Sequence, residues 1–571
     1  MDKAGQGVAL FAFGSNGNGQ LGIASDDDTS TPQPVHLTAT GGVSSTVLQF
    51  HPSQHNIKGN DNDDDEERKQ AYFNATTPFH DFAAGGNHTA FITHGSRQLF
   101  MTGSNKDGET LLQEPSQVFK SSDLSGLLRP PPQRQQLNKV EGQESISPPA
   151  DKDKDDSKNG IRWRSVACGW AFTIGLTEPY PAPDSHDTIA ACLSNTTPDN
   201  NQTLYAWGSG SFGELGLGPG RSKTGGQAIA ITTGLLDHSN TTRGRFELVK
   251  VRAGLRHVLL LAKETRSHLD NQDNSEATRT RTVLMGWGSN RQGQLGVLTR
   301  SGVLLSEKEL RGKFMEPTRI VISPGPRSTS VDRRDNNNDE LEIVDMACGQ
   351  NHSLVLFTNG TVYSSGLDKY GQLGPRATAD IDKEAEKGKT VDFRIGFEQV
   401  IGLPFVDSIS CGWSHNAAMD KRPFVDPTAM TTIYLWGRND HGQLGGGVPL
   451  RALNVGLTGG LEGAPVGIVQ VRIPARRKGG GEDRMVESEE EYEQLVSYSC
   501  GSEHTLAMTR SSACYAWGWN EHGNCGGGVD GAGNKDLQDV PSPRPIQFPT
   551  LSSSPSQGWV VGGYGSSWVW T

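Results

Sequence analysis

The sequence lacks any long apolar segment and is poor in cysteine and in aromatic residues. Its 571 residues include 7 Cys, 11 Trp, 10 Tyr and 19 Phe. No apolar run approaches the roughly 18 residues that a membrane-spanning helix needs. The N-terminus also lacks the charged segment followed by an apolar one that marks a signal peptide. We therefore expect no membrane contact, a cytoplasmic and nuclear location, and thiols that stay reduced.

Positive charge is scarce as well. The chain carries 53 Lys and Arg against 65 Asp and Glu, a net charge of −12. Direct binding of nucleic acid needs a clustered basic face, and a short patch such as Arg476-Arg-Lys478 does not supply one. We therefore expect no direct contact with nucleic acid.

The spacing motifs of common catalytic and metal sites are missing. There is no Walker A motif, H-E-x-x-H, C-x-x-C or G-x-S-x-G. Gly17–Gly22 and Gly208–Gly213 match G-x-G-x-x-G, but a dinucleotide fingerprint opens a helix within a βαβ unit. These copies recur in a β-rich repeat instead. We expect a protein that is not an enzyme and that needs no cofactor or metal. The alternative, a hydrolase or lyase site in the central channel, would require clustered carboxylates or a metal there.

Glycine, by contrast, is abundant, with 71 residues, and much of it falls in one recurring motif. Phe11-Ala-Phe-Gly-Ser-Asn-Gly-Asn-Gly-Gln-Leu-Gly22 returns most clearly as Gly288-Ser-Asn-Arg-Gln-Gly-Gln-Leu-Gly296. A fixed motif at long spacing indicates a repeat architecture. Copies begin at Gly14, Gly103, Gly208, Gly288, Gly366, Gly437 and Gly518.

A second motif, Cys/Ala-Gly-x-x-His followed by Ser or Thr, alternates with the first. Its copies begin at Ala84, Cys168, Ala253, Cys348, Cys411, Cys500 and Val561. The copies at Cys168 and Val561 have Phe172 and Gly565 in the histidine position. We interpret the four cysteines of this motif as small buried side chains that are too far apart to form disulfides.

Each repeat unit reads as four strands. Val344–Ala347 precedes the glycine, Ser353–Phe357 follows it, an Asn-Gly turn leads to Val362–Ser365, and a segment such as 316–322 supplies the fourth strand. Seven such units predict an all-β fold, a seven-bladed β-propeller of four-stranded blades that spans residues 1–571 as one domain. We expect it to be monomeric.

The repeats are longer than a four-stranded blade of roughly 40–50 residues, and the excess is polar. We expect disordered inserts in the polar segments, which lie near 51–70, 120–160, 183–203, 264–280, 324–340, 376–390 and 476–492. Residues 228–236 and 298–315 are less polar and could be ordered.

The two ends of the chain are expected to pair. Within the chain, the strand after each Gly-x-x-His turn is followed by the strand before the next Gly-x-Asn loop, and the two form a hairpin. The first strand before a Gly-x-Asn loop and the last strand after a Gly-x-x-His turn have no such neighbour in the sequence. Pairing of 567–571 with 8–13 would close the ring and remove two sheet edges.

The motif residues themselves are expected to maintain the fold. Glycine permits positive φ and close backbone contact, asparagine bonds to local backbone in tight turns, and one histidine per blade cannot converge into a metal site. We predict that the histidines bond to neighbouring backbone and the glutamines to a loop or the next blade. This signature comprises Gly14, Asn16, Gln20, Gly22, Gly85, His88, Gly254, His257, Gly288, Gln294, Gly349, His352, Gly412, His415, Gly437, Gln443, Gly501, His504 and Gly518.

The seven alternations of xVYxWGxNxxGQLG with CGxxHS resemble the regulator of chromosome condensation repeat family. The resemblance implies a seven-bladed propeller that acts through protein contacts. The name-giving members are exchange factors for a small nuclear GTPase, with a basic N-terminal tail and an ordered β-wedge that disturbs the nucleotide. This chain has no basic tail, and an ordered hairpin projecting from one blade would favour exchange.

Phe11–Gly22 and the acidic continuation Asp26–Pro32 are most similar to the fungal alpha-tubulin suppressor subgroup. That resemblance implies a non-catalytic accessory partner of a small zinc-binding protein, in diphthamide synthesis and Elongator-dependent modification of tRNA wobble uridines. The alternatives are a guanine-nucleotide exchange factor or regulator for a small GTPase, and a scaffold with a tubulin-related cytoskeletal role.

Overall fold

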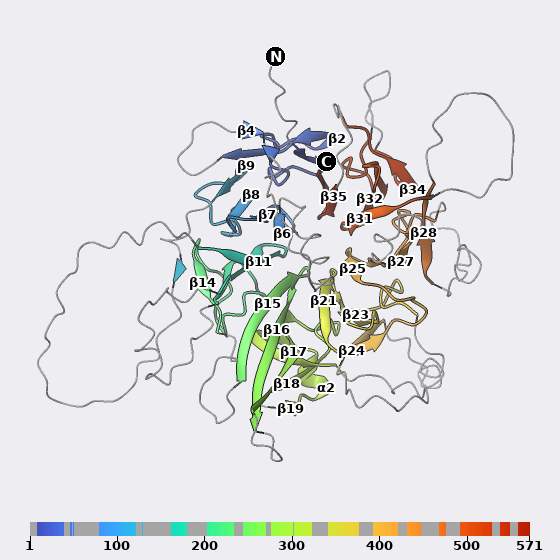
Figure 1. The fold of residues 1–571 in the computed structure, drawn as a ribbon. Helices are drawn as coiled ribbons and strands as arrows, with labels where there is room; N and C mark the ends of the chain where they lie inside the picture. Colours follow the sequence, from blue (N-terminus) through green and yellow to red (C-terminus); the bar gives the residue numbers. More distant parts are fainter. Residues whose placement is uncertain are drawn as a thin grey trace, which may run out of the picture.

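The computed structural model places seven β-sheets in a ring around a central axis, as Figure 1 shows, and residues at the ends of the inner strands line a channel on that axis. The structure describes residues 8–38, 46–47, 49–50, 79–121, 128–129, 161–179, 202–232, 244–269, 276–300, 302–322, 341–375, 392–420, 431–446, 467–474, 492–527, 537–548 and 558–570. Nearly all regular structure in these ranges is β-strand, which confirms the predicted seven-bladed propeller. No helix among the described residues is long and apolar enough to cross a membrane.

Four antiparallel strands form the core of each blade, and their order runs from the innermost strand outward. Blade 1 comprises β35 (Trp559–Gly562), β36 (Ser566–Trp570), β1 (Val8–Gly14) and β2 (Thr29–Pro34). Blade 2 comprises β6 (Phe79–Ala84), β7 (His88–Thr93), β8 (Leu99–Gly103) and β9 (Ser116–Ser121). Blade 3 comprises β11 (Trp163–Cys168), β12 (Phe172–Thr177), β13 (Leu204–Gly208) and β14 (Ala228–Ala230). Blade 4 comprises β15 (Gly244–Ala253), β16 (His257–Leu269), β17 (Glu276–Ser289) and β20 (Lys313–Val321).

Blades 5 to 7 repeat this order. Blade 5 comprises β21 (Ile343–Cys348), β22 (His352–Phe357), β23 (Val362–Leu367) and β24 (Phe393–Gln399). Blade 6 comprises β25 (Ser408–Cys411), β26 (His415–Met419), β27 (Ile433–Gly437) and β28 (Val469–Val471). Blade 7 comprises β31 (Leu495–Cys500), β32 (His504–Thr509), β33 (Cys514–Gly518) and β34 (Val540–Pro545).

Short elements decorate these cores. They are β3 (His36–Thr38), β4 (Thr46–Val47), β5 (Gln49–Phe50), β10 (Leu128–Arg129), β18 (Val297–Arg300), β19 (Val303–Leu304), α2 (Glu307–Leu310), β29 (Ile473–Pro474) and β30 (Tyr492–Glu493). Two less polar inserts are therefore ordered in large part, because β14 lies within 228–236 and β18, β19 and α2 lie largely within 298–315.

The ring closes through blade 1 in the predicted way. β36 lies between β35 and β1, with Leu10 opposite Trp570 and Gly14 opposite Ser566. The Trp568 side chain is fully buried in the cluster that also holds Leu10 and Phe79. Strands from opposite ends of the chain therefore complete one blade, and neither is left as an open edge.

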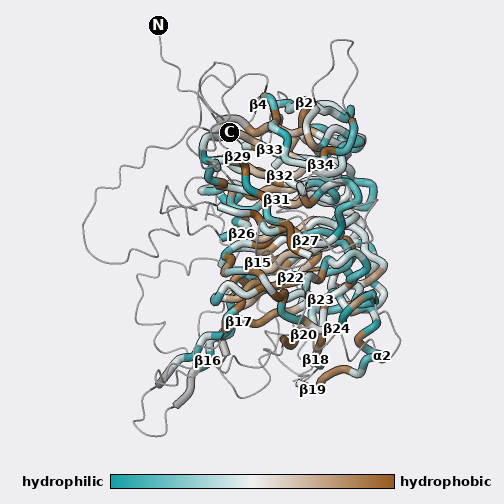
Figure 2. Tube along the Cα trace, turned by 90° about the vertical axis from the view of Figure 1, so that its right-hand side faces the viewer, coloured by the Kyte–Doolittle hydropathy of each residue, from teal (hydrophilic) through white to brown (hydrophobic). Residues whose placement is uncertain are grey.

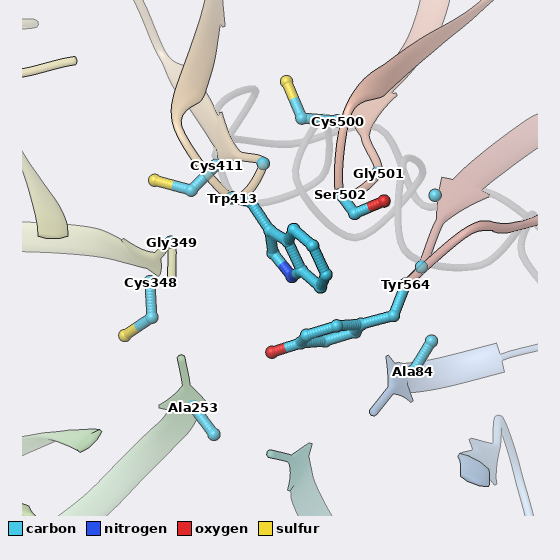
Figure 3. Close-up of a pocket in the computed structure, with 13 residues that line it drawn as sticks. Ala84, Ala253, Cys348, Gly349, Cys411, Trp413, Cys500, Gly501, Ser502 and Tyr564 are labelled. Carbon is cyan, nitrogen blue, oxygen red and sulfur yellow. The ribbon is translucent and has the colours of Figure 1, made fainter. Parts of the chain in front are cut away.

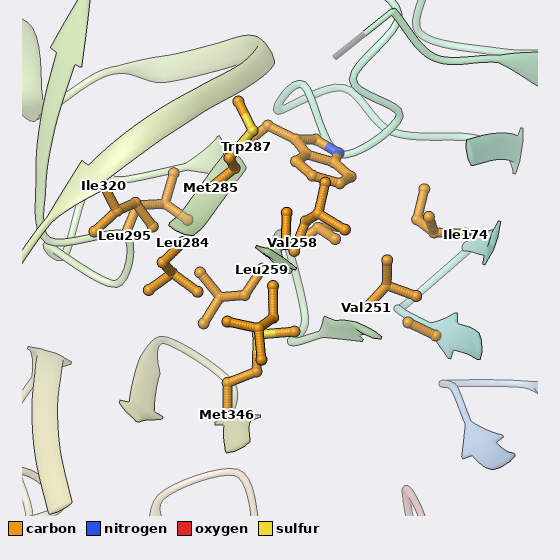
Figure 4. Close-up of a cluster of buried hydrophobic side chains, with 14 of the residues drawn as sticks. Ile174, Val251, Val258, Leu259, Leu284, Met285, Trp287, Leu295, Ile320 and Met346 are labelled. Carbon is orange, nitrogen blue, oxygen red and sulfur yellow. The ribbon is translucent and has the colours of Figure 1, made fainter. Parts of the chain in front are cut away.

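The core lies between the blades, where each sheet packs against the next. Figure 4 shows the largest cluster, in which Val258, Leu259 and Trp287 of blade 4 pack between Ile174 of blade 3 and Met346 of blade 5. The side chain before the repeat glycine is a fully buried tryptophan in four blades: Trp207, Trp287, Trp436 and Trp517. This buried apolar area stabilises each blade against its neighbours.

The two ends of the propeller differ. The Gly-x-x-His turns and the Gly-x-Asn loops lie together at one end, because Gly288 pairs with His257 and Gly366 with His352. We call this end the loop face. The turns between the second and third strands lie at the other end, the hairpin face, from which β16 and β17 project beyond the ring in Figure 2.

One of the segments that we predicted to be disordered, residues 264–280, is ordered over most of its length. Residues 264–269 and 276–280 belong to β16 and β17, with Glu264 opposite Arg281 and Leu269 opposite Glu276. Backbone pairing supplies the hydrogen bonds that this polar segment needs, so it does not require a large apolar core. The other predicted inserts, 51–70, 120–160, 183–203, 324–340, 376–390 and 476–492, fall almost entirely outside the described residues, and β10 and the ends of β9 and β30 lie within their limits.

Candidate interaction surfaces

The repeat histidines connect neighbouring blades. In each of five blades the imidazole Nε2 bonds to the side chain that follows the histidine position in the next blade. The expected bond to backbone is therefore wrong: the partner is a side chain brought in by the ring. The pairs are His88 with Thr173 (2.8 Å), His257 with Ser353 (2.9 Å), His352 with Asn416 (2.6 Å), His415 with Thr505 (3.1 Å) and His504 with Ser567 (2.9 Å).

The network fixes the protonation of these rings. The Thr505 hydroxyl donates its one hydrogen to the Gln443 carbonyl (2.9 Å), so it can only accept from Nε2–H of His415. In the other four pairs, the partner side chain likewise donates a hydrogen bond to a backbone carbonyl of the histidine's own blade. Its oxygen therefore accepts from the Nε2–H of the histidine. The Nδ1 atoms of all five rings are buried without a hydrogen-bond partner among the described residues. Each ring is thus a neutral Nε2–H donor.

Burial shifts the titration of these histidines. It lowers the pKa of His257, His415 and His504 to about 3, and the pKa of His88 and His352 to about 4, because a charged imidazole would lack solvation. The rings lie on separate blades, and the described residues contain no group of three or more His, Cys, Asp or Glu that could hold a metal. Their geometry is that of a seam between blades.

Two seams depart from this scheme. Phe172 takes the histidine position in blade 3, and the residue facing it in blade 4 is the apolar Val258, so no hydroxyl is left unpaired; both are fully buried. In blade 1 the histidine position is Ser566, since Gly563 N donates to Ser566 O as Gly85 N donates to His88 O. The sequence alignment of this copy, which put Gly565 there, is wrong by one residue.

The glycine before each histidine is required by the ring that packs over it. A Cβ on Gly349 would lie 2.0 Å from Cε1 of His352, and one on Gly501 would lie 2.0 Å from Cε1 of His504. Gly85, Gly254 and Gly412 face their own histidines at 2.3–2.7 Å in the same way. Any side chain at these positions would displace the imidazole from its partner.

The first motif forms a loop that is held from within. The Asn16 and Asn290 side-chain oxygens accept from the amides of Leu21 (2.9 Å) and Leu295 (2.7 Å). The glutamine side chain accepts from the amide two residues earlier, for Gln20, Gln294 and Gln443 at 2.9–3.0 Å. Gly14, Gly288, Gly437 and Gly518 begin these loops with φ between +97° and +110°, and Gly22 ends one at +70°.

The same loops also reach the next blade through backbone. The Gln443 carbonyl accepts from the indole of Trp517 (3.0 Å), and the Gln372 carbonyl accepts from Trp436 (3.2 Å). The signature residues therefore occupy seams and loop interiors, and none of them forms an exposed binding surface.

The channel is covered at the loop face by aromatic side chains. Trp170, Trp413 and Tyr564 occupy the same turn position in blades 3, 6 and 1, and the Tyr564 ring lies 6.3 Å from Trp170 and 5.5 Å from Trp413. Figure 3 shows Trp413 and Tyr564 pointing toward each other, with Cys348 and Cys411 around them. All six described cysteines are free thiols, and burial raises the pKa of Cys348 and Cys500 to about 12. Thiols with such a pKa are poor nucleophiles at neutral pH.

Charged groups of the innermost strands pair with each other. Arg252 of blade 4 reaches Asp81 of blade 2 (Nη1 to Oδ2, 3.1 Å), and Lys250 reaches Asp345 of blade 5 (Nζ to Oδ1, 2.6 Å). Burial alone would raise the pKa of Asp81, but Arg252 and Lys250 hold it below its usual value. The two carboxylates are committed to ion pairs that bridge blades.

The projecting hairpin has a rigid base. The Glu264 carboxylate, 2 % exposed, lies among three guanidinium groups: Arg266 (2.5 Å), Arg281 (2.7 Å) and Arg319 (3.3 Å). Burial would raise the pKa of Glu264, but hydrogen bonds from Arg266 and Arg281 hold it below its usual value. Because Arg319 lies on β20, the cluster joins the hairpin to the outer strand of the blade. The alternating Thr278-Arg-Thr-Arg-Thr282 was the available sequence signal, since such alternation is typical of a strand.

Models of the regulator of chromosome condensation (RCC1) repeat match residues 9–51, 284–356, 343–372 and 496–524. The chain is 26% identical to the secretion-regulating guanine nucleotide exchange factor of Mus musculus, over 97% of this chain and 82% of that protein. It is 25% identical to the protein of that name from Bos taurus, over 94% of this chain and 78% of that protein.

Solved structures share the fold. Prp20p from Saccharomyces cerevisiae has a TM-score of 0.54 at 16% identity, covering 99% of this chain and 92% of that one. Human WBSCR16 has a TM-score of 0.52 at 15% identity, and the match covers 98% of this chain and 99% of that one. The chain therefore carries regulator of chromosome condensation (RCC1) repeats, and its seven interleaved motifs form the seven blades of one propeller.

Proposed function

We propose that this propeller is a protein-binding regulator of a small GTPase and that the β16–β17 hairpin promotes nucleotide exchange. The observation that carries this proposal is the ordered hairpin itself. It extends from one blade, projects beyond the ring in Figure 2, and is fixed at its base by Glu264 and its arginines. A segment that opens a nucleotide site must keep its position under load, so a rigid base suits that task.

Relatives support the same class of function. Two relatives that align with nearly the whole chain are named as secretion-regulating guanine nucleotide exchange factors. Prp20p, which shares the fold, is described by its binding to Gsp1p and histones. Both kinds of protein act through contacts with other proteins.

A nucleotide-release assay tests the proposal. A panel of small GTPases is loaded with fluorescent GDP, and the purified full chain is added with excess unlabelled GTP. We expect release to accelerate about tenfold or more for one GTPase, equivalent to ~1.4 kcal/mol in the barrier. In the shortened variant, residues 264–281 are replaced by Asn-Gly, which joins Lys263 to Thr282 in a tight turn. We expect this variant to bind the GTPase weakly and to lose the acceleration.

A matched control keeps the hairpin and alters the loop face, by Arg256→Glu and Arg291→Glu. It should accelerate release as the wild type does. The proposal fails if no GTPase in the panel responds, or if the shortened variant melts normally and is equally active.

A second candidate is supported by the N-terminal stretch. Phe11–Gly22 and Asp26–Pro32 resemble the alpha-tubulin suppressor subgroup, which implies an accessory partner of a small zinc-binding protein in diphthamide synthesis and tRNA wobble-uridine modification. Affinity purification that recovers such a protein in stoichiometric amount, without a GTPase, would favour this candidate. Failure to recover it would count against it.

A further inference from the structure

A cluster of cations surrounds one aromatic ring on the loop face, at the junction of blades 3 and 4. The Phe212 ring lies in the loop after β13. The Arg256 guanidinium is 4.2 Å from its centroid, the Lys313 ammonium 4.7 Å and the Arg291 guanidinium 5.4 Å. These three come from the Gly-x-x-His turn, the start of β20 and the loop after β17 of blade 4. We call the four residues the Phe212 cluster.

The positive charge of the Phe212 cluster is not neutralised at the surface. Arg256, Arg291 and Lys313 are exposed, and none of them forms an ion pair with a carboxylate among the described residues. Glu214 lies beneath the cluster, but its side chain is buried and accepts from the Phe212 amide (2.6 Å). Lys313 donates to the Ser211 carbonyl (2.9 Å), which holds its ammonium in place. Three ordered cations thus face solvent above one buried carboxylate.

The corresponding positions elsewhere on the loop face are occupied differently. His441 and His522, which match Phe212 in blades 6 and 7, bond to Asp539 (2.8 Å) and Asp28 (2.7 Å). Tyr370 in blade 5 contacts Arg438, which is itself paired with Asp440 and Glu503. Lys369 also lies 5.1 Å from the Tyr370 ring, but three cations without a carboxylate partner among the described residues gather around one ring at the junction of blades 3 and 4, in a chain whose net charge is −12.

The residue types around the cluster suit a protein partner. Trp170 precedes Ala171, whose carbonyl accepts from the Ser209 amide at the start of the Phe212 loop (2.8 Å), and its side chain, which contacts Tyr564, is 48 % exposed. Tryptophan and arginine are among the residues that most often dominate binding at protein interfaces. A guanidinium stacked on an aromatic ring keeps its N–H edges free for a carboxylate. Nucleic acid fits less well, because it needs an extended basic face and would be repelled by the acidic remainder of the chain.

We propose that the Phe212 cluster binds an acidic segment of a partner protein, with carboxylates on Arg256, Arg291 and Lys313 and an apolar side chain against Trp170. This surface lies on the face opposite the projecting hairpin. The propeller could therefore hold an acidic partner and a GTPase at the same time, and the proposal does not depend on the exchange activity.

Fluorescence anisotropy with the full chain tests the proposal. The probe is a short labelled peptide of Asp and Glu with one central Phe. We expect salt-sensitive binding that the double variant Arg256→Glu/Arg291→Glu weakens about tenfold or more. The variant Trp170→Ala should weaken binding without changing its dependence on salt.

The matched control is Lys120→Glu/Arg510→Glu, which makes the same change in net charge at exposed positions outside the loop face. It should bind the peptide as the wild type does. All variants are checked by thermal melting, and only those that melt within a few degrees of wild type are compared. The proposal is overturned if the wild type does not bind the peptide, if both double variants weaken binding equally, or if a single-stranded oligonucleotide of equal charge binds more tightly than the peptide.

Discussion

At the scale of the residue, the seams between blades depend on neutral histidines. Each of the five rings donates from Nε2 to the next blade and leaves a bare, buried Nδ1. Protonation would add a buried N–H without an acceptor and a charge without solvent. The stability of the ring should therefore depend on pH.

We expect stability to fall as pH drops below 6.5. The pKa of each histidine is lowered in the folded state, to about 3 or about 4, so below pH 6.5 the unfolded chain binds more protons. At pH 5.5 each histidine should cost about 1.4 kcal/mol, or roughly 7 kcal/mol for five if they act independently. Denaturant unfolding at pH 7.5 and 5.5 measures this. Imidazole titration near 6.5 in the folded protein would contradict it.

Blade 3 supplies a template for replacing one histidine. His415→Ala should destabilise the protein by about 3 kcal/mol, because it leaves a cavity and removes a buried hydrogen bond. The double variant His415→Phe/Thr505→Val copies the Phe172–Val258 pair, and the Gln443 carbonyl keeps its bond to Trp517. We expect this variant to recover at least half of the loss and to be less sensitive to acid than wild type. Equal stability of the two variants would show that the seam does not depend on complementary pairs.

The motifs led to the prediction that these positions maintain the fold, but they did not indicate the partners of the histidines. The motif alone shows that His88 and His504 recur with Gly and Ser or Thr. The bonded residues are 63 to 96 positions apart, and only the closure of the ring brings them together. The one-residue error at Gly565 has a similar origin, since Gly562 and Gly563 offer two equivalent alignments in the sequence.

At the scale of the element, β36 holds the ring closed. It pairs with β35 on one side and β1 on the other, and it buries Trp568 and Trp570. Loss of a buried tryptophan costs about 3–5 kcal/mol, so two of them approach the whole stability of a typical domain.

Deletion of residues 566–571 should therefore unfold the protein cooperatively at room temperature. Circular dichroism and tryptophan fluorescence measure the loss. A synthetic peptide of residues 564–571, added in excess, should restore the native signal by completing blade 1, which separates lost pairing from general damage. A truncated protein that melts as the intact one does would contradict this account of closure.

The projecting hairpin is the element that sequence reasoning missed. Its Thr, Arg and Glu residues have the composition of a polar insert, and no apolar run marks it. The hairpin is ordered by backbone pairing and by the Glu264 carboxylate, which contacts arginines from three segments. The contact with Arg319 depends on β20 lying beside β17, and the sequence does not show that β20 lies there.

Glu264→Gln should loosen the base of the hairpin without affecting the ring. It removes the charge that offsets Arg266, Arg281 and Arg319. We expect faster hydrogen exchange at the paired amides of β16 and β17 beyond this point, with the free energy of global unfolding changed by less than about 2 kcal/mol. Unchanged exchange in the hairpin would show that backbone pairing alone orders it.

At the scale of the whole molecule, the propeller has a structural interior and two ends that carry the binding surfaces we propose. The seams and the core follow the regular spacing of the motifs within this chain, whereas the channel cap, the projecting hairpin and the Phe212 cluster depend on residues that only some of the blades carry. The repeats therefore predict the fold but not the function, because the binding surfaces that we propose lie where a blade differs from its neighbours.

In the function that we propose, a small GTPase engages the hairpin face. Affinity purification from the source cells, with mass spectrometry, tests it directly when wild type is compared with the variant in which Asn-Gly replaces residues 264–281. We predict that wild type recovers a small GTPase in nucleotide-free buffer and that the shortened variant loses it while retaining acidic partners of the loop face. Recovery of the GTPase in equal amount by both proteins, or by neither, would contradict the claim.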